Sequence, residues 1–191
     1  GFHCYSDDIK RQVIAHHYCS QLNEDFRQCI IYDSDKADAK VIGVEYIVSE
    51  NVFKTLPEEE KRFWHSHVFE IKSGMLTSPN APFTMEHEVM KILINTYGKT
   101  IHLWQIDRGD KLPLGEPKVM MAPVNESIVN WDLINKRDQV YGIDHKQLQE
   151  NRKDISDPII DPGADQWSKT GKGIRLEPRD VSLDISLSRI V

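Results

Sequence analysis

The sequence has no long apolar run. No window approaches the roughly 18 consecutive apolar residues that a membrane-spanning helix requires. It therefore predicts no transmembrane segment. The first residues, Gly1-Phe2-His3-Cys4, also lack the basic start and apolar core of a signal peptide. We accordingly expect a cytoplasmic protein.

Basic residues are in deficit, since 24 Lys and Arg stand against 30 Asp and Glu, for a formal net charge of −6. Proteins that bind nucleic acid usually carry a basic face that offsets the phosphate charge. The composition therefore predicts that nucleic acid is not a partner.

Cysteine is scarce, with only Cys4, Cys19 and Cys29 in the chain and no C-x-x-C pair among them. Disulfide scaffolds usually carry an even and larger number of cysteines. The sequence therefore favours three reduced thiols.

What remains is an ordinary globular composition: 191 residues, 39% of them hydrophobic and 28% charged. That length and composition suit one domain with a real core. Helix caps and apolar periodicity predict helices over residues 6–22, 57–74, 84–98, 131–141 and 144–154. Apolar and β-branched runs predict strands over 26–32, 41–48, 100–106 and 118–122, with a short helical turn from Ser49 toward Leu56.

This order of elements predicts a single α+β domain with a small, mostly antiparallel sheet packed with helices. Proline and glycine become frequent beyond Ser156. We therefore place the core domain at residues 1–156 and an extended C-terminal arm at residues 157–191.

The histidines are concentrated, and the first question is whether His65-x-His67 is a metal motif. On a strand both rings would share a face, but the flanking residues favour a helix, on which the two rings diverge by roughly 200°. On that helix, His67 and Glu70 would form the inward-facing pair. This pair is either a structural hydrogen-bonded pair, a pair of metal ligands or an acid–base pair without metal.

Glu45 interrupts a strand that is otherwise apolar, and a buried carboxylate must be paired, hydrogen-bonded, metal-bound or protonated. His102 lies on a predicted strand and His17 on the first predicted helix. If the inner face of the sheet carries His102 and the covering helix carries His67, the two rings can meet in one internal site.

Six segments of the chain form a recognisable set: Ala15-His16-His17-Tyr18-Cys19, Arg27-Gln28-Cys29-Ile30-Ile31-Tyr32-Asp33-Ser34-Asp35, Ile42-Gly43-Val44-Glu45-Tyr46, Trp64-His65-Ser66-His67, Tyr97-Gly98-Lys99-Thr100 and Asp107-Arg108-Gly109-Asp110. They resemble the oil body-associated protein family, a family of unknown function in plants, fungi and bacteria. The resemblance runs from Phe2 to about Trp167. It implies an association of the plant members with seed oil bodies, and it supplies no activity that could be carried over to this chain.

Two hypotheses follow. In the first, the chain is a metal-dependent enzyme or a metal- or ligand-binding domain, with metal ligands drawn from His17, His67, Glu70 and His102. Glu45 then either orients these ligands or acts as general base. Imidazole ligands favour Zn, Fe or Cu, and the ligand would be a small molecule or a lipid. In the second, the chain is a noncatalytic protein that associates peripherally with lipid droplets. The sequence leaves a homodimer open under both.

Overall fold

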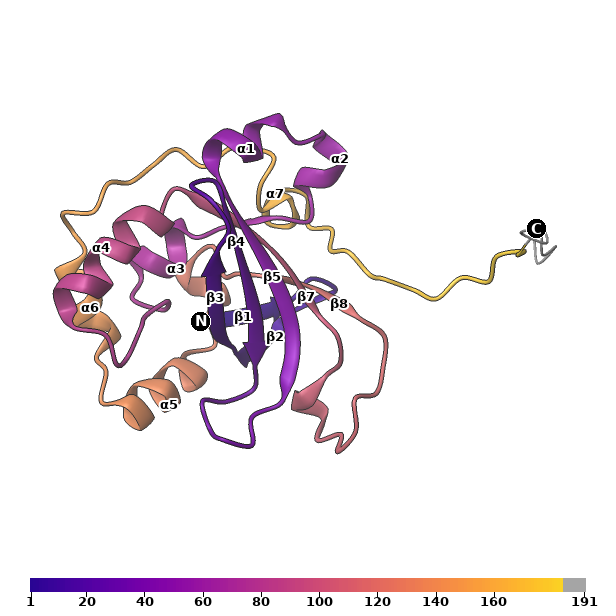
Figure 1. The fold of residues 1–191 in the computed structure, drawn as a ribbon, viewed down its shortest axis with the longest axis horizontal. Helices are drawn as coiled ribbons and strands as arrows, with labels where there is room; N and C mark the ends of the chain where they lie inside the picture. The colour runs from indigo at the N-terminus through magenta and orange to yellow at the C-terminus, as the bar shows by residue number, and fades with distance from the viewer. Residues whose placement is uncertain (184–191) are drawn as a thin grey trace, which may run out of the picture.

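In a computed structural model of the chain, residues 1–183 are described. They form one curled antiparallel sheet in the order β2-β1-β8-β7-β5-β4-β3, with β6 beside β7 (Figure 1). Its eight strands, counted over the described residues, are β1 Phe2–Tyr5, β2 Asp8–Ile14, β3 His16–Gln21, β4 Phe26–Tyr32, β5 Val41–Ser49, β6 His65–Ser66, β7 Thr96–His102 and β8 Lys118–Met121. The predicted α+β class and antiparallel pairing are confirmed, and the sheet is larger than predicted.

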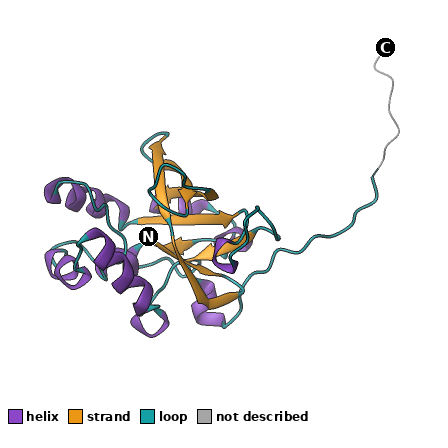
Figure 2. Ribbon diagram, turned by 90° about the horizontal axis from the view of Figure 1, so that it is seen from below, coloured by secondary structure: helices purple, strands orange, loops and turns teal. Residues whose placement is uncertain are grey.

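The helices gather mostly on one side of the sheet, as Figures 1 and 2 both show. Helices α3, α4 and α5 contribute to the cavity on the inner face of the sheet, while α1 and α2 follow β5 at one end of the molecule. The helices of the described part are α1 Glu50–Thr55, α2 Glu58–Lys61, α3 Val68–Lys72, α4 Phe83–Leu93, α5 Trp131–Tyr141, α6 His145–Asn151 and α7 Gln166–Thr170.

Elements with strong local signals form where the sequence predicts them. The strands predicted at 26–32, 41–48 and 118–122 correspond to β4, β5 and β8, and the helix predicted at 131–141 is α5. Ser49 caps α1 by accepting a hydrogen bond from Val52 N, and the Asp144 carboxylate caps α6 in the same way. These caps satisfy amide groups that a helix cannot pair internally.

The helix predicted over residues 6–22 is wrong, because this segment forms β2 and β3. Ser6 and Asp7 do not cap a helix; they form the turn between β1 and β2, where Tyr5 pairs with Asp8. The residues of β3 pair with β4 along its whole length. Long-range strand pairing therefore overrides the local helical signal, and His17 comes from a strand.

The single helix predicted over residues 57–74 is also wrong. The chain forms the short helices α2 and α3, and between them β6 pairs with β7, with His65 opposite Gly98. The helix predicted to run to Gly98 ends earlier, because α4 stops at Leu93 and β7 begins at Thr96. Pairing of β6 with β7 directs the His65 ring toward the interior.

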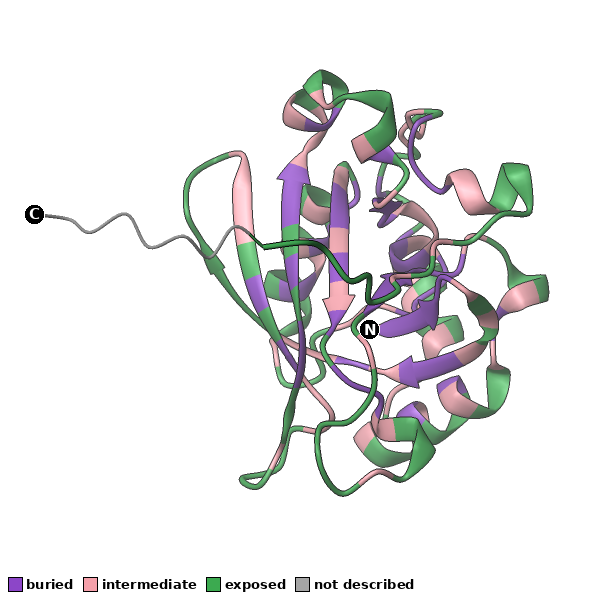
Figure 3. Ribbon diagram, turned by 90° about the vertical axis from the view of Figure 1, so that its right-hand side faces the viewer, coloured by how far each residue is buried: buried purple, intermediate pink, exposed green. Residues whose placement is uncertain are grey.

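The core is divided between the two faces of the sheet. Figure 3 shows buried residues along the strands and exposed ones in the turns. On the inner side Ile71, Met90 and Ile94 form one buried cluster. At the end covered by α1, the rings of Phe53 and Tyr97 stack with centroids 3.9 Å apart. The sheet is therefore buried on parts of both faces, and helices occupy both.

The described part of the predicted arm, residues 157–183, begins by packing on the domain. Ala164 is buried, and Asp165 N donates a hydrogen bond to the backbone oxygen of Trp64 over 3.1 Å. Beyond α7, Ile174 N still donates a hydrogen bond to Ser6 Oγ over 2.9 Å, and the described residues after this contact extend away from the body (Figure 1). The division at residue 156 stays a prediction, and residues 184–191 of the predicted arm lie outside the described part.

Two of the three cysteines form a disulfide, so the prediction of three reduced thiols is wrong. Cys19 and Cys29 are directly opposite each other on β3 and β4 and are bonded. The antiparallel register, invisible in the sequence, brings the two thiols together. Cys4 is buried outside this bond. No helix in residues 1–183 has the length and hydropathy to cross a membrane.

Candidate metal centre

Glu45 is the centre of the polar cluster inside the sheet. It lies on β5 between Cys29 of β4 and Thr100 of β7, and only 3% of its surface is exposed. Neighbouring residues of a strand point to opposite faces, so Val44 and Tyr46 are exposed while Glu45 points inward. The strand thus carries a carboxylate into the interior, as the sequence predicted from its apolar flanks.

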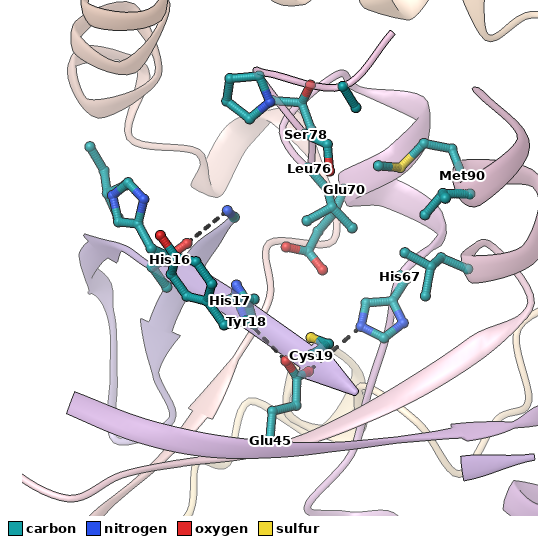
Figure 4. A pocket seen from close by; sticks show the side chains of 18 of the residues that line it. His16, His17, Tyr18, Cys19, Glu45, His67, Glu70, Leu76, Ser78 and Met90 are labelled. Atoms are coloured by element: carbon teal, nitrogen blue, oxygen red, sulfur yellow. Dashed lines mark hydrogen bonds and ion pairs between the residues drawn. The ribbon is translucent and has the colours of Figure 1, made fainter. Parts of the chain in front are cut away.

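Three imidazole rings surround this carboxylate. His17 Nε2 lies 3.0 Å from Glu45 Oε2, while His65 Nε2 and His67 Nε2 lie 3.3 Å and 3.6 Å from Oε1. Figure 4 shows His17 and His67 directed at the Glu45 carboxylate. Glu45 Oε1 is buried and has no hydrogen-bond partner among the described residues. A buried carboxylate oxygen without a partner is costly unless a cation or a proton compensates it.

The spacing of these atoms suits a metal ion. Ligand atoms bound at 2.0–2.1 Å in a tetrahedral site stand about 3.3 Å apart. Two sets of ligand atoms lie within 4.8 Å of one another, namely His3, His17 and Glu45, and Glu45, His65 and His67. Glu45 belongs to both sets. The donor atoms therefore fit a transition-metal ion bound at Glu45.

Thr96 fixes the orientation of the His67 ring. His67 Nδ1 lies 3.1 Å from the Thr96 carbonyl oxygen and 2.9 Å from its Oγ1. A carbonyl oxygen only accepts, so Nδ1 carries the proton and donates it. In the neutral ring Nε2 then presents a lone pair toward Glu45. Two acceptors facing each other are the arrangement that a bound cation stabilises, and such backing of a histidine is usual at metal sites.

Two further histidines extend the cluster away from Glu45. His17 Nε2 lies 3.1 Å from His3 Nε2, and His3 Nδ1 lies 2.9 Å from His102 Nε2. Burial lowers the pKa of His3 well below its usual value and that of His102 to about 3, and the neighbouring His17 lowers both further. Both rings are therefore neutral at physiological pH.

Glu45 itself is ionised. Burial would raise its pKa, but the neighbouring His17, His65 and His67 outweigh burial and hold the pKa well below the usual value. For His65, burial works to lower the pKa, yet the Glu45 carboxylate raises it overall. The centre therefore combines one fixed negative charge with imidazole donors.

A glycine makes room for this arrangement. Gly98 lies on β7 opposite His65, on the face that carries Glu45. A Cβ atom at this position would lie 2.1 Å from Glu45 Oε1 and 2.7 Å from His65 Nε2. Both distances are far below van der Waals contact, so the site depends on the missing side chain.

The cluster opens on a cavity of about 550 Å³ between the inner face of the sheet and the helices. His17, Glu45, His65 and His67 line its polar side, and the carboxylate of the buried Glu70 points into it from α3 (Figure 4). Apolar side chains line the remainder: Ile14, Ile47, Leu76, Val89, Met90 and Leu93. This volume and mixed lining are typical of a small-molecule site.

The predicted site residues are found in one region, but with different distances to its centre. His17 and His67 contact Glu45, whereas His102 reaches the cluster through His3. Glu70 lies on the cavity wall and belongs to neither set of ligand atoms. The assignment of metal ligands among these residues stays a prediction.

Sequence reasoning missed His3 and did not choose His65. His3 lies on a four-residue strand that has no periodicity to reveal it. The helix predicted over 57–74 directs the His65 ring away from that of His67, so the predicted site does not include His65. The structure shows that both His65 and His67 face the interior, with 1% and 4% of their surfaces exposed. The strand interpretation of His-x-His is the signal that would have found His65.

The chain is similar to known proteins over nearly its whole length. The family profile described as "Protein of unknown function (DUF1264)" matches residues 1–156. "Oil body-associated protein 1A" of Zea mays is 49% identical over 97% of this chain and 78% of its own length. The chain belongs to the oil body-associated protein family. The resemblance seen in the sequence is thereby confirmed.

Further members of the oil body-associated protein family show the same extent of similarity. "Oil body-associated protein 2A" of Zea mays is 48% identical over 92% of this chain and 71% of its own length. "Oil body-associated protein 1B" of Arabidopsis thaliana is 44% identical over 96% of this chain and 76% of its own length. No solved structure matches the chain.

Proposed function

We propose that this chain is a peripheral oil-body protein whose fold holds a transition-metal centre at Glu45. The names of its relatives support the first part, and the convergence of three imidazoles on one buried carboxylate supports the second. The two parts are independent, so each has its own test.

The outer face of the sheet offers a surface for oil-body association. Tyr18, Ile30 and Val44 lie side by side on β3, β4 and β5, and Tyr46 follows two residues along β5. These four side chains, which we call the outer apolar face, are each between 42% and 56% exposed. Contiguous exposed apolar groups mark interaction sites, including those for lipid surfaces.

Co-flotation with artificial oil bodies tests this part. The double variant Ile30→Ser/Tyr46→Ser should reduce the fraction that floats with triacylglycerol droplets coated with phospholipid several-fold, because it removes two apolar contacts. The matched control is Leu112→Ser/Leu114→Ser, which removes exposed leucines from the loop between β7 and β8. Equal flotation of all three proteins, or no flotation of the wild type, would overturn the outer apolar face as the attachment surface.

For the metal centre we propose Glu45, His65 and His67 as ligands, with His17 beside them at the second carboxylate oxygen. Two imidazoles and one carboxylate form the ligand set of catalytic zinc sites and of non-haem iron sites, which keep a position open. A bound metal would supply a Lewis acid at the edge of the cavity. Glu70, which points into the same cavity, would accept a proton there, in place of the base role predicted for Glu45.

Elemental analysis of untagged protein tests the centre. After reconstitution with Zn²⁺, Fe²⁺ or Cu²⁺ and desalting, the wild type should retain close to one ion per chain. Glu45→Gln keeps the shape of the side chain but removes its charge, so it should retain little. Glu126→Gln, at an exposed position, is the matched control. Metal retention by Glu45→Gln equal to that of the wild type, or no retention by either, would refute the centre.

A further inference from the structure

Arg27 is a charged side chain of the cavity that the metal centre does not use. It lies on β4, lines the cavity and is partly buried. Among the described residues its guanidinium forms no hydrogen bond and no ion pair, and burial lowers its pKa. The group nevertheless stays protonated, because the pKa of arginine is far above physiological pH. A partly buried guanidinium without a partner is suited to bind an anion, best a carboxylate or phosphate.

Apolar side chains surround the space beside Arg27. Ile47 is directly opposite Arg27 on β5. Val89, Met90 and Leu93 of α4 form the facing wall together with Leu76. Val89 and Leu93 are four residues apart and therefore lie on the same side of their helix. A ligand bound to Arg27 thus finds a hydrocarbon surface next to its anionic end.

The metal centre is adjacent to this anion site. Arg27 and Cys29 are two residues apart on β4, and Cys29 is opposite Glu45. Residues two apart on one face of a strand are separated by about 7 Å. Arg27 and Glu45 therefore enter the same cavity from neighbouring positions on adjacent strands. Glu70 faces the cavity from α3, so a second carboxylate on the ligand would be repelled there.

We propose that this cavity binds a long-chain monocarboxylic acid, with its carboxylate on Arg27 and its hydrocarbon chain against Ile47, Leu76, Val89, Met90 and Leu93. This inference deepens the proposed function, because it names the class of ligand that the cavity at the metal centre takes. An acyl ligand of this kind is present wherever triacylglycerol is hydrolysed.

Displacement of a fluorescent fatty acid, such as a dansyl-labelled undecanoic acid, tests the proposal on the intact protein below the micellar concentration of each competitor. Oleate should displace the probe. Oleyl alcohol, which lacks the carboxylate, and lysophosphatidylcholine, which carries a phosphate headgroup, should compete at least tenfold less well. Preferential displacement by lysophosphatidylcholine would identify a phospholipid site and overturn the fatty-acid assignment.

Substitution of Arg27 separates the carboxylate contact from general apolar binding. Arg27→Gln should weaken the binding of oleate about 10- to 100-fold, the usual effect of losing a charge-assisted hydrogen bond. It should leave the affinity for oleyl alcohol unchanged. Arg27→Lys should restore most of the oleate affinity. Arg179→Gln, at an exposed position, is the matched control. Equal oleate affinity in Arg27→Gln and wild type would refute the contact.

The same samples distinguish failure of this inference from failure of the metal centre. Oleate binding is measured with the protein treated with chelator and with the protein reconstituted with Zn²⁺, and the metal content of each is determined. A protein that retains metal but does not bind oleate refutes the acid ligand and leaves the centre standing. A protein that retains no metal but binds oleate through Arg27 refutes the centre and supports the acid ligand.

Discussion

The backbone of Gly98 lies directly beneath the carboxylate of Glu45, so close that a Cβ atom would stand 2.1 Å from Oε1. The same atom would stand 2.7 Å from Nε2 of His65. Two chemically active side chains from β5 and β6 therefore meet over a residue that has no side chain. The oil body-associated family match covers this position.

Replacing this glycine should remove the metal centre. Gly98→Ala forces both Glu45 and His65 aside, so we expect the affinity for Zn²⁺ to fall more than about 100-fold, with a loss of about 1–3 kcal/mol in the free energy of unfolding from overpacking. Isothermal titration and urea unfolding measure the two effects. Gly109→Ala, where no atom lies within 4 Å of the added Cβ, should lose stability because its φ is 78°, but should keep the metal. Undiminished Zn²⁺ affinity in Gly98→Ala would contradict the arrangement.

The hydroxyl group of Thr96 should tune the affinity of the centre. It accepts the Nδ1–H of His67 and donates to the Leu93 carbonyl oxygen over 2.7 Å. Thr96→Val keeps the shape and the backbone carbonyl, so we expect metal affinity to fall by about 10-fold, the lower end of the usual effect of such partners. Competition with a chromophoric chelator measures it. Thr55→Val is the control. It removes a hydroxyl that donates to the Val52 carbonyl oxygen, and it should leave the metal affinity unchanged.

The disulfide should contribute measurably to stability. Cys19 and Cys29 close a loop with a sequence separation of 10, for which the loss of chain entropy in the unfolded state predicts about 2–3 kcal/mol. Urea unfolding of the wild type with and without a dithiol reductant should show this difference. Cys19→Ala/Cys29→Ala should equal the reduced wild type and should not respond to reductant. A wild type that is insensitive to reductant would show that the bond contributes nothing.

Asp165 should make stability depend on pH between about 4 and 6. Burial raises its pKa from 3.8 to about 6. The folded state therefore binds the proton more tightly than the unfolded state, and the free energy of unfolding falls as pH rises through this window. Asp165→Asn removes the cost of burying an ionised carboxylate, and asparagine tolerates the left-handed φ of 52° at this position.

The gain in the free energy of unfolding from Asp165→Asn is expected at neutral pH and not near pH 4. Asp165→Asn should be more stable than the wild type on the order of 1–3 kcal/mol at pH 7.5 and equal to it near pH 4. Urea unfolding at both pH values measures the difference. The same difference at pH 4 and pH 7.5 would mean that the titration of Asp165 is not its cause.

Local signals explain which elements could be predicted. Helix α5 has a capping Asn130 at its start and Gly142 in the left-handed region at its end, so the sequence alone bounds it. Strands β4 and β5 are rich in β-branched and aromatic residues. By contrast, β3 contains His16, His17 and Cys19, whose strand conformation comes from pairing with β4. The six residues of β3 contain no local pattern that indicates a strand.

The candidate site was predictable only in part, for the same reason. Glu45 stands out in the sequence because an acid interrupts an apolar strand, and that signal is local. His65 and His17 were placed on helices, and their approach to Glu45 depends on the register of β3, β6 and β7. His3 enters through β1, whose position between β2 and β8 no sequence pattern indicates.

The place of β1 in the sheet also bears on how the chain folds. Cys4 and Tyr5 pair with Met121 and Met120 of β8, so the contact joins residues more than one hundred positions apart along the chain. Such distant pairings make loop closure slow, and they delay the completion of the sheet until β8 has been synthesised. His3 lies on β1, so the histidine cluster is complete only once this long-range pairing has formed. Occupation of the complete cluster would therefore follow this step of folding rather than guide earlier ones.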